Sequence, residues 1–334
     1  MCSGQWGAVD RVFSMRFSLP SKTDDSVTPG SSRRSNGRAA LLWIDACSGE
    51  FQQRAAWEGV ARGLQRFPLT AADTISFVSY QILPDGGFGA SILGCDNASA
   101  VEKLGMPTVR RLLPQVQVSA DIGCTAGMSA MRRLFANPQP FIQAAVAKAV
   151  SLKLSMYNLD VEINPHLIST KDAADMIVFV RAFASALHAR GKLLSTDLGR
   201  CRLAGFGGQF RNSCANWTMT GVDAVVTMQT YWHQMHTREP SYTLADWEKE
   251  VAVNAQILGR ERYIVGLDKG FGAINQSKAP GGRRSTERSV KILAAALRSL
   301  GTQQLRRIAV WGAKEVDDLF VSTLGAWLSE PERI

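Results

Sequence analysis

The chain alternates between short apolar runs rich in β-branched residues and longer stretches in which apolar residues recur every three or four positions. Short runs of the first kind predict buried parallel strands, and the spacing of three and four predicts amphipathic helices. We expect strands at residues 40–46, 74–82, 115–121, 156–163, 192–198, 222–230, 262–268 and 307–312. We expect helices at residues 50–66, 97–112, 138–153, 170–190, 243–257, 286–300 and 314–328, and a loop before a short helix within 201–219.

Eight such alternations predict an α/β fold, namely the closed TIM (β/α)8 barrel. A chain of 334 residues is long enough for this fold. The first predicted strand is not followed by a GxGxxG motif, which argues against an open dinucleotide-binding sheet. Before the first strand, residues 20–38 are rich in Ser, Pro, Gly and charge, so they bury too little surface to fold. We therefore predict a disordered leader over residues 1–38 and one barrel domain over residues 39–334.

Composition narrows the choice of partner and compartment. The formal charge of +9 is spread over scattered Arg and Lys residues, so no basic stripe indicates a nucleic-acid partner. Because the N-terminus has no secretory core and no long apolar run occurs, we expect a cytoplasmic protein without a membrane partner, secreted only if the true N-terminus differs. We also expect a monomer. The widely spaced cysteines lack a CxxC pair and are predicted to be reduced and buried: Cys2, Cys47, Cys95, Cys124, Cys201 and Cys214.

The fourth predicted strand carries the clearest candidate chemistry. In SMYNLDVE the polar residues Asn158, Asp160 and Glu162 alternate with apolar ones, so a strand presents all three on one face. If that face lies inside the barrel mouth, crowded like charges favour protonation of the outermost group. Glu162 would then act as a general acid near neutral pH. The alternative is that both acids only cap a strand at a solvated loop.

This segment resembles the strand-four motif D-G-x-D-x-D-x-E of family 18 glycoside hydrolases, the chitinase and endo-N-acetylglucosaminidase group. Aligned on Glu162, Asp160 matches the Asp two positions before the acid. Asn158 and Ser155 stand where the earlier Asp residues usually are, and Met156 replaces the Gly. The match is therefore divergent.

Three further segments resemble the same family at the corresponding strands. VQVSADIG is similar to the strand-three Ser-x-Gly-Gly segment, and VVTMQTYW carries Gln229 and Tyr231 in the Q-x-Y spacing of strand six. IAVWGAKEVDD places Trp311 where the family has the Trp beneath the sugar. The resemblance extends over about residues 40–328.

The resemblance implies substrate-assisted retaining cleavage of β-linked N-acetylglucosamine glycans, such as chitin or an N-glycan core. Glu162 would protonate the glycosidic oxygen, Asp160 would orient the N-acetyl group, and Tyr231 would hydrogen-bond its carbonyl oxygen. No cofactor and no metal are implied. The predicted substrate-binding residues are Asn158, Gln229, Trp311, Asp45 and Met228.

Two other functions fit the same residues. Loss of the earlier acids would suit a catalytically silent barrel that binds carbohydrate as a lectin. Acids at several strand ends would suit a metal-dependent barrel enzyme, although each one alone is more typical of a cap: Asp45, Asp121, Asp197 and Asp268. His233 and His236 lack a nearby third ligand of the kind that zinc sites use, so no metal site is predicted there.

Overall fold

The predicted TIM barrel is confirmed: eight parallel strands pair in chain order and close on one another, because β1 pairs with both β2 and β8. The computed structural model describes residues 37–44, 66–70, 73–89, 111–118, 125–161, 163, 165–198, 212, 214–227, 243–268, 287–311 and 316–331. The strands are β1 (Ala39–Ile44), β2 (Thr74–Ile82), β3 (Arg111–Val118), β4 (Met156–Asp160), β5 (Leu193–Leu198), β6 (Ala224–Thr227), β7 (Tyr263–Asp268) and β8 (Arg307–Trp311).

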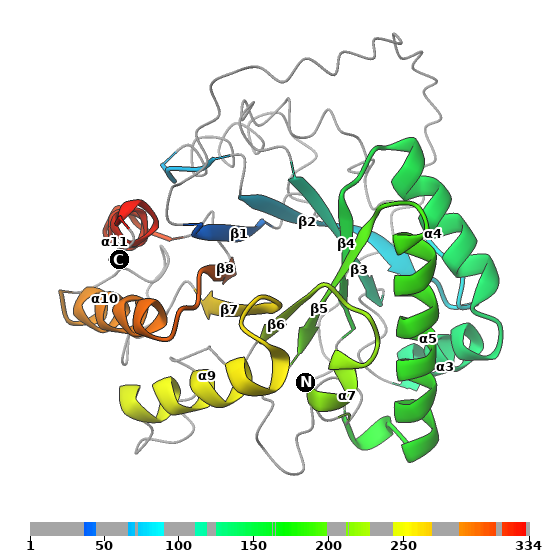
Figure 1. Cartoon of the computed structure of the whole chain (residues 1–334). Coiled ribbons are helices and arrows are strands. Elements are labelled where there is room, and N and C mark those ends of the chain that lie inside the picture. Colours follow the sequence, from blue (N-terminus) through cyan, green and yellow to red (C-terminus); the bar gives the residue numbers. More distant parts are fainter. Residues whose placement is uncertain are drawn as a thin grey trace, which may run out of the picture.

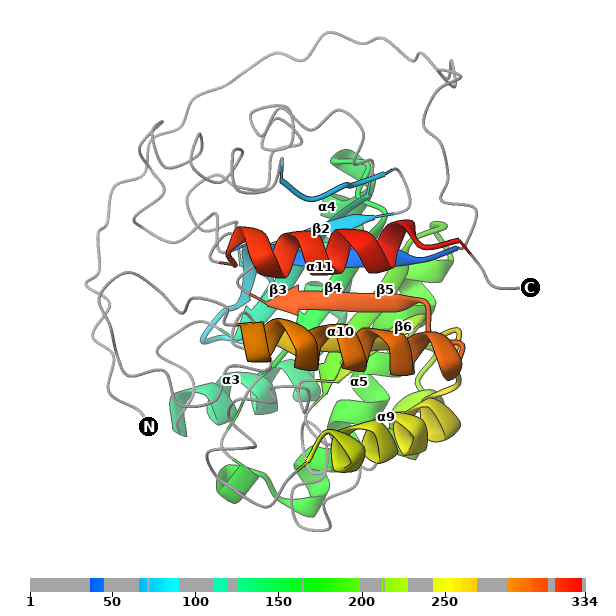
Figure 2. The ribbon, with the colours of Figure 1, turned by 90° about the vertical axis from the view of Figure 1, so that its left-hand side faces the viewer.

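Helices surround the ring of strands (Figure 1). Figure 2 shows α9, α10 and α11 lying side by side along one flank of the barrel, in agreement with the contacts between these neighbours. The described helices are α3 (Thr125–Ala136), α4 (Gln139–Ser151), the 3-10 turn η4 (Pro165–Leu167), α5 (Thr170–His188), α7 (Cys214–Thr218), α9 (Leu244–Leu258), α10 (Glu287–Thr302) and α11 (Asp318–Ser329).

The structure corrects the end of one predicted helix and adds a helix that was not predicted. The helix expected at 97–112 cannot include its last two residues, because the ladder between β2 and β3 already begins at Arg111. The strand predicted at 115–121 begins four residues earlier, and Pro114 pairs inside the ladder although it has no N–H to donate. The helix α3 was missed, although its apolar residues Met128, Met131 and Leu134 recur every three positions, as in an amphipathic helix. Most of the predicted helix at 50–66, most of the predicted leader at 1–38 and residues 97–110 of the predicted helix at 97–112 lie in parts of the chain that the structure does not describe.

Apolar side chains fill both faces of the sheet. Inside the ring, a small buried cluster contains Leu41, Trp43, Ala224, Val226, Ile264 and Ala309. Outside it, the large core lies between strands and helices, and its aromatic centre includes Tyr80 and Tyr157, whose ring centroids are 5.8 Å apart. The inside of the barrel is therefore a packed core around β1 and β6 to β8, as barrels of this size require.

The last helix is fastened to the start of the first strand. The guanidinium of Arg38 lies 4.7 Å from the ring centroid of Trp327, pairs with Glu330 at 3.1 Å and donates to the Trp327 carbonyl. Beside it, the Ala39 amide donates to the Arg306 carbonyl at 2.9 Å. These contacts hold α11 against the seam where β1 meets β8.

One cysteine departs from the predicted redox state. Cys214 at the start of α7 is buried, as predicted, but it is disulfide-bonded to a cysteine beyond the described residues. The prediction failed because sequence spacing does not show which thiols the fold brings together. Among the helices that the structure describes, none has the length and apolarity needed to cross a bilayer.

A buried phenol ties β6, β7 and α9 together. The hydroxyl of Tyr263 is 3.0 Å from the Thr227 hydroxyl and accepts from the Asn254 amide at 3.2 Å. Burial raises the pKa of Tyr263 to about 12, because the charged phenolate would lose its hydration. The group is neutral at all ordinary pH values, so its contribution comes from hydrogen bonds and packing.

We predict that Tyr263→Phe lowers the free energy of unfolding by about 1 to 3 kcal/mol, because Thr227 and Asn254 each lose a buried hydrogen bond to the Tyr263 hydroxyl. Urea unfolding at pH 7 measures this difference. Tyr157→Phe is the matched comparison, because its hydroxyl donates one bond, to the Ala145 carbonyl at 2.9 Å, among the contacts described. A Tyr263→Phe variant as stable as the parent would contradict the prediction.

Candidate active site

The inner face of β4 is polar toward its carboxyl end. Tyr157, Leu159 and Val161 belong to the outer core, so the intervening Asn158 and Asp160 point into the barrel. Asn158 is fully buried, and Asp160 is 5% exposed. The predicted shared face of these two residues is confirmed, and Asp160 is not a solvated strand cap. Reactive groups of TIM barrels lie at this end of the strands.

Asn158 joins β4 to β5 through its side-chain amide. Its Nδ2 donates to Ser195 Oγ at 2.8 Å and to Asp197 Oδ1 at 3.1 Å. Ser195 Oγ in turn donates to the Tyr157 carbonyl at 3.4 Å. Asn158 Oδ1 is buried and has no hydrogen-bond partner within the described part of the chain. The amide is therefore held in one orientation, with an acceptor still available in the interior.

Asp197 is part of this group, contrary to the cap favoured for it from sequence alone. It is fully buried, and its carboxylate accepts from a side chain on the neighbouring strand. The ladder between β4 and β5 pairs Asn158 with Ser195 and Leu159 with Thr196. Continued by one residue, this register sets Asp160 beside Asp197 on the inner face. Reasoning from sequence missed the contribution of Ser195 and Asp197, although their alternation in LLSTDL already placed both on one face.

Of the remaining predicted site residues, the structure describes the backbone of Trp311. Trp311 ends β8, where its backbone pairs with Asp268 of β7. The other five lie outside the described residues, and their roles stay predictions: Glu162, Tyr231, Gln229, Met228 and Asp45. Within the described residues, no group of three or more His, Cys, Asp or Glu side chains is placed to bind a metal ion.

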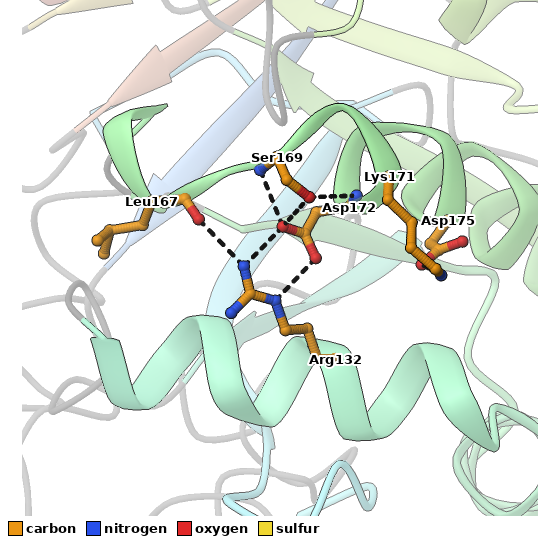
Figure 3. Close-up of polar contacts among 6 residues, drawn as sticks. All are labelled: Arg132, Leu167, Ser169, Lys171, Asp172 and Asp175. Atoms are coloured by element: carbon orange, nitrogen blue, oxygen red, sulfur yellow. Dashed lines mark hydrogen bonds and ion pairs between the residues drawn. The ribbon is translucent and has the colours of Figure 1, made fainter.

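The segment after β4 is anchored to α3 by a charged cluster (Figure 3). Arg132 donates from Nε to Asp172 Oδ1 at 2.9 Å and from Nη2 to Asp172 Oδ2 at 2.8 Å. The same Nη2 reaches the carbonyl of Leu167, at the end of η4, at 3.4 Å. The short connection between β4 and α5 is thus fixed at its far end, from Leu167 to the first turn of α5.

Asp172 also caps α5. The Ser169 hydroxyl accepts from the Asp172 amide at 3.1 Å, and the Ser169 amide donates back to Asp172 Oδ2 at 2.8 Å, which forms a capping box. The hydrogen bond from Arg132 is the main reason why the pKa of Asp172 lies well below its usual range, and the bonds from Ser169 add to the effect. The same pair raises the pKa of Arg132. Only 4% of the Asp172 side chain is exposed, so its charge depends on these donors.

We predict that Asp172→Asn destabilises the protein by about 2 kcal/mol at pH 7, because it removes a charge-assisted, bidentate contact and weakens a helix cap. Since the folded-state pKa is lowered, the stabilisation exists above the unfolded value of about 3.9 and is lost as pH falls below it. Unfolding by urea between pH 2 and 7 should therefore show a shallower acid loss in the variant than in the parent.

Asp175→Asn is the control for this prediction. Its partner Lys171 is 82% exposed, so loss of that ion pair should change stability by less than about 0.5 kcal/mol. An acid profile of Asp172→Asn that parallels the parent would show that the cluster in Figure 3 does not govern acid stability.

The sequence matches no known family model and no curated protein, whereas solved structures do match. A chitinase from Chromobacterium violaceum ATCC 12472 is 13% identical over 88% of this chain and 100% of its own, with a TM-score of 0.60. The spore cortex-lytic enzyme SleL of Bacillus megaterium QM B1551 is 12% identical over 92% of this chain and 77% of its own, with a TM-score of 0.61. A class V chitinase mutant from Nicotiana tobaccum in complex with NAG4 is 10% identical over 88% of this chain and 99% of its own, with a TM-score of 0.61. The chain therefore has the barrel fold of the chitinases and of SleL, the fold that the family 18 resemblance implied.

Proposed function

We propose that the protein is a glycosidase that cleaves β-linked, N-acetylglucosamine-containing glycans by the substrate-assisted retaining mechanism. The observation that carries the proposal is the position of Asp160. It is a nearly buried carboxylate on the inner face of β4, at the carboxyl end of the strand and two residues before Glu162. A carboxylate confined there can bind a polar group that enters the barrel mouth, because water does not compete for it.

The proposed roles follow from the alternation of β4. Asn158 and Asp160 face inward, and a strand that continues with the same period would present Glu162 next, nearer to solvent. Glu162 would then donate a proton to the glycosidic oxygen and later accept one from water. Asp160 would accept the substrate's N-acetyl N–H and so align the acetyl oxygen for attack on the anomeric carbon. Tyr231 would hydrogen-bond that oxygen.

The similar structures support this substrate class. Chitinases share the fold over most of their length, and one of them is in complex with NAG4. The spore cortex-lytic enzyme SleL shares this fold too. An oligosaccharide with N-acetylglucosamine units is therefore the first substrate to test. We also propose that the protein works in an oxidising compartment, and the disulfide of Cys214 supports this proposal.

We predict that the purified protein releases the fluorophore from a fluorogenic N,N'-diacetylchitobioside between pH 4 and 8. Glu162→Gln should lower turnover by about 100-fold or more, because general acid catalysis is lost. Asp160→Ala should lower it by about 100-fold, because the acetamido group loses its electrostatic partner. Asp175→Asn, on the exposed outer face of α5, should leave turnover unchanged.

Equal turnover in the parent and in both site variants would contradict the proposed roles of Glu162 and Asp160. A parent that binds chitooligosaccharides without cleaving them, measured by calorimetry, would instead identify a carbohydrate-binding lectin. A turnover that disappears with a chelator and returns with a divalent metal would identify a metal-dependent enzyme.

A further inference from the structure

A second carboxylate stands beside Asp160, and the mechanism proposed above does not use it. Asp197 lies on the inner face of β5 and is fully buried. Its Oδ1 accepts from Asn158 Nδ2 at 3.1 Å. The β4–β5 ladder ends with the pair Leu159 and Thr196, and the next position on each strand is Asp160 and Asp197. Neighbouring strands lie about 4.8 Å apart, so side chains at paired positions on the same face are adjacent.

The contacts around Asp197 fix its position. Ser195 and Thr196 bind the carbonyls of Tyr157 and Leu159, at 3.4 Å and 3.1 Å, which locks β5 against β4. Because Ser195 Oγ gives its proton to a carbonyl, it accepts from Asn158 Nδ2, and the amide must present its N–H groups toward β5. Asn158 is therefore oriented as a donor to Asp197.

The surroundings of Asp197 strengthen its electrostatic interaction with Asp160. On the side of β4, Asp197 faces Asn158 and Asp160. On the side of β6 it pairs with Val226, which belongs to the apolar inner cluster and does not titrate. Charges interact strongly where apolar side chains replace water. A negative charge on one carboxylate therefore disfavours ionisation of a carboxylate at the adjacent buried position.

We infer that Asp197 is a positioning residue for Asp160: it holds Asn158 beneath Asp160 and places a fixed carboxylate next to it, so that the two acids share a proton and Asp160 keeps one orientation. In this arrangement Asp197 supplies a negative charge from β5, because the neighbouring residue on β4, Asn158, is neutral. Its consequence for catalysis rests on the proposed glycosidase function, whereas the coupling between the two carboxylates does not.

The test measures the coupling directly. Protein labelled with ¹³C at the aspartate carboxyls is titrated by NMR, and the Asp160 signal is the one missing in Asp160→Asn. In Asp197→Asn the titration midpoint of Asp160 should fall by about one pH unit, because removal of a neighbouring negative charge favours the ionised form. Asp175→Asn, far from the barrel interior on α5, should leave the midpoint unchanged. A midpoint that Asp197→Asn does not move overturns the inference, whether or not the protein is an enzyme.

A charge exchange tests the consequence for turnover. Asp197→Asn should lower kcat about tenfold with little change in KM, since the effect is on positioning rather than on binding. Asn158→Asp alone sets two carboxylates against each other and should lower the melting temperature. The double variant Asn158→Asp with Asp197→Asn restores one donor and one acceptor, and it should recover both the melting temperature and most of kcat.

The two failures are distinguishable. An inert parent in which the Asp160 midpoint still moves with Asp197→Asn would end the glycosidase proposal and support the inference. An active parent whose Asp197→Asn variant keeps its kcat and its Asp160 midpoint would support the glycosidase and overturn the inference.

Discussion

The pairing of β1 with β8 is the constraint on which the rest of the structure depends. Ala39 to Leu42 pair with Arg307 to Val310, so the first and last strands of the described barrel have no open edge there. Closure divides the side chains of every strand into an inner and an outer set, since successive residues point to opposite faces. The contacts of Arg38 with α11 stand at this seam and connect the end of the chain to its first strand.

Closure also places the polar side chains of β4 and β5 in the interior of the barrel. The interior of a barrel this size is filled by side chains, and Leu41, Trp43, Ile264 and Ala309 fill it with apolar atoms. On β4 and β5 the same inner positions hold an amide, a hydroxyl and two carboxylates: Asn158, Ser195, Asp160 and Asp197. Buried polar groups need hydrogen-bond partners, and the bonds between these two strands supply several of them. The polar residues of the two strands therefore stabilise one another in the interior, and Asp160 stands at the carboxyl end of β4.

The outer helices contribute to the site through the segments between the strands. Arg132 on α3 binds both Asp172 at the start of α5 and the carbonyl of Leu167 just before it. One end of the β4–α5 connection is consequently fixed by a bidentate ion pair with little exposed carboxylate surface. Because the other end is the last residue of β4, the position of this connection depends on the barrel and on α3 together.

The sequence by itself determined the fold class and the face of β4. Apolar runs at regular spacing predicted seven of the strand positions closely, and the alternation in SMYNLDVE placed Asn158 and Asp160 on one face. Period and composition are local properties, so they can be read from a single segment. The start of β3 was missed at Pro114, which is unusual within a strand, whereas α3 was missed although Met128, Met131 and Leu134 have helical spacing.

Only the tertiary structure decided which polar groups meet. That Asn158 binds Asp197 depends on the register between β4 and β5, which is set by closure of the whole ring and not by either strand. The ion pair of Arg132 with Asp172 joins a helix before β4 in the chain to a helix after it. Such contacts depend on the packing of elements in space, for which a single sequence carries no local pattern.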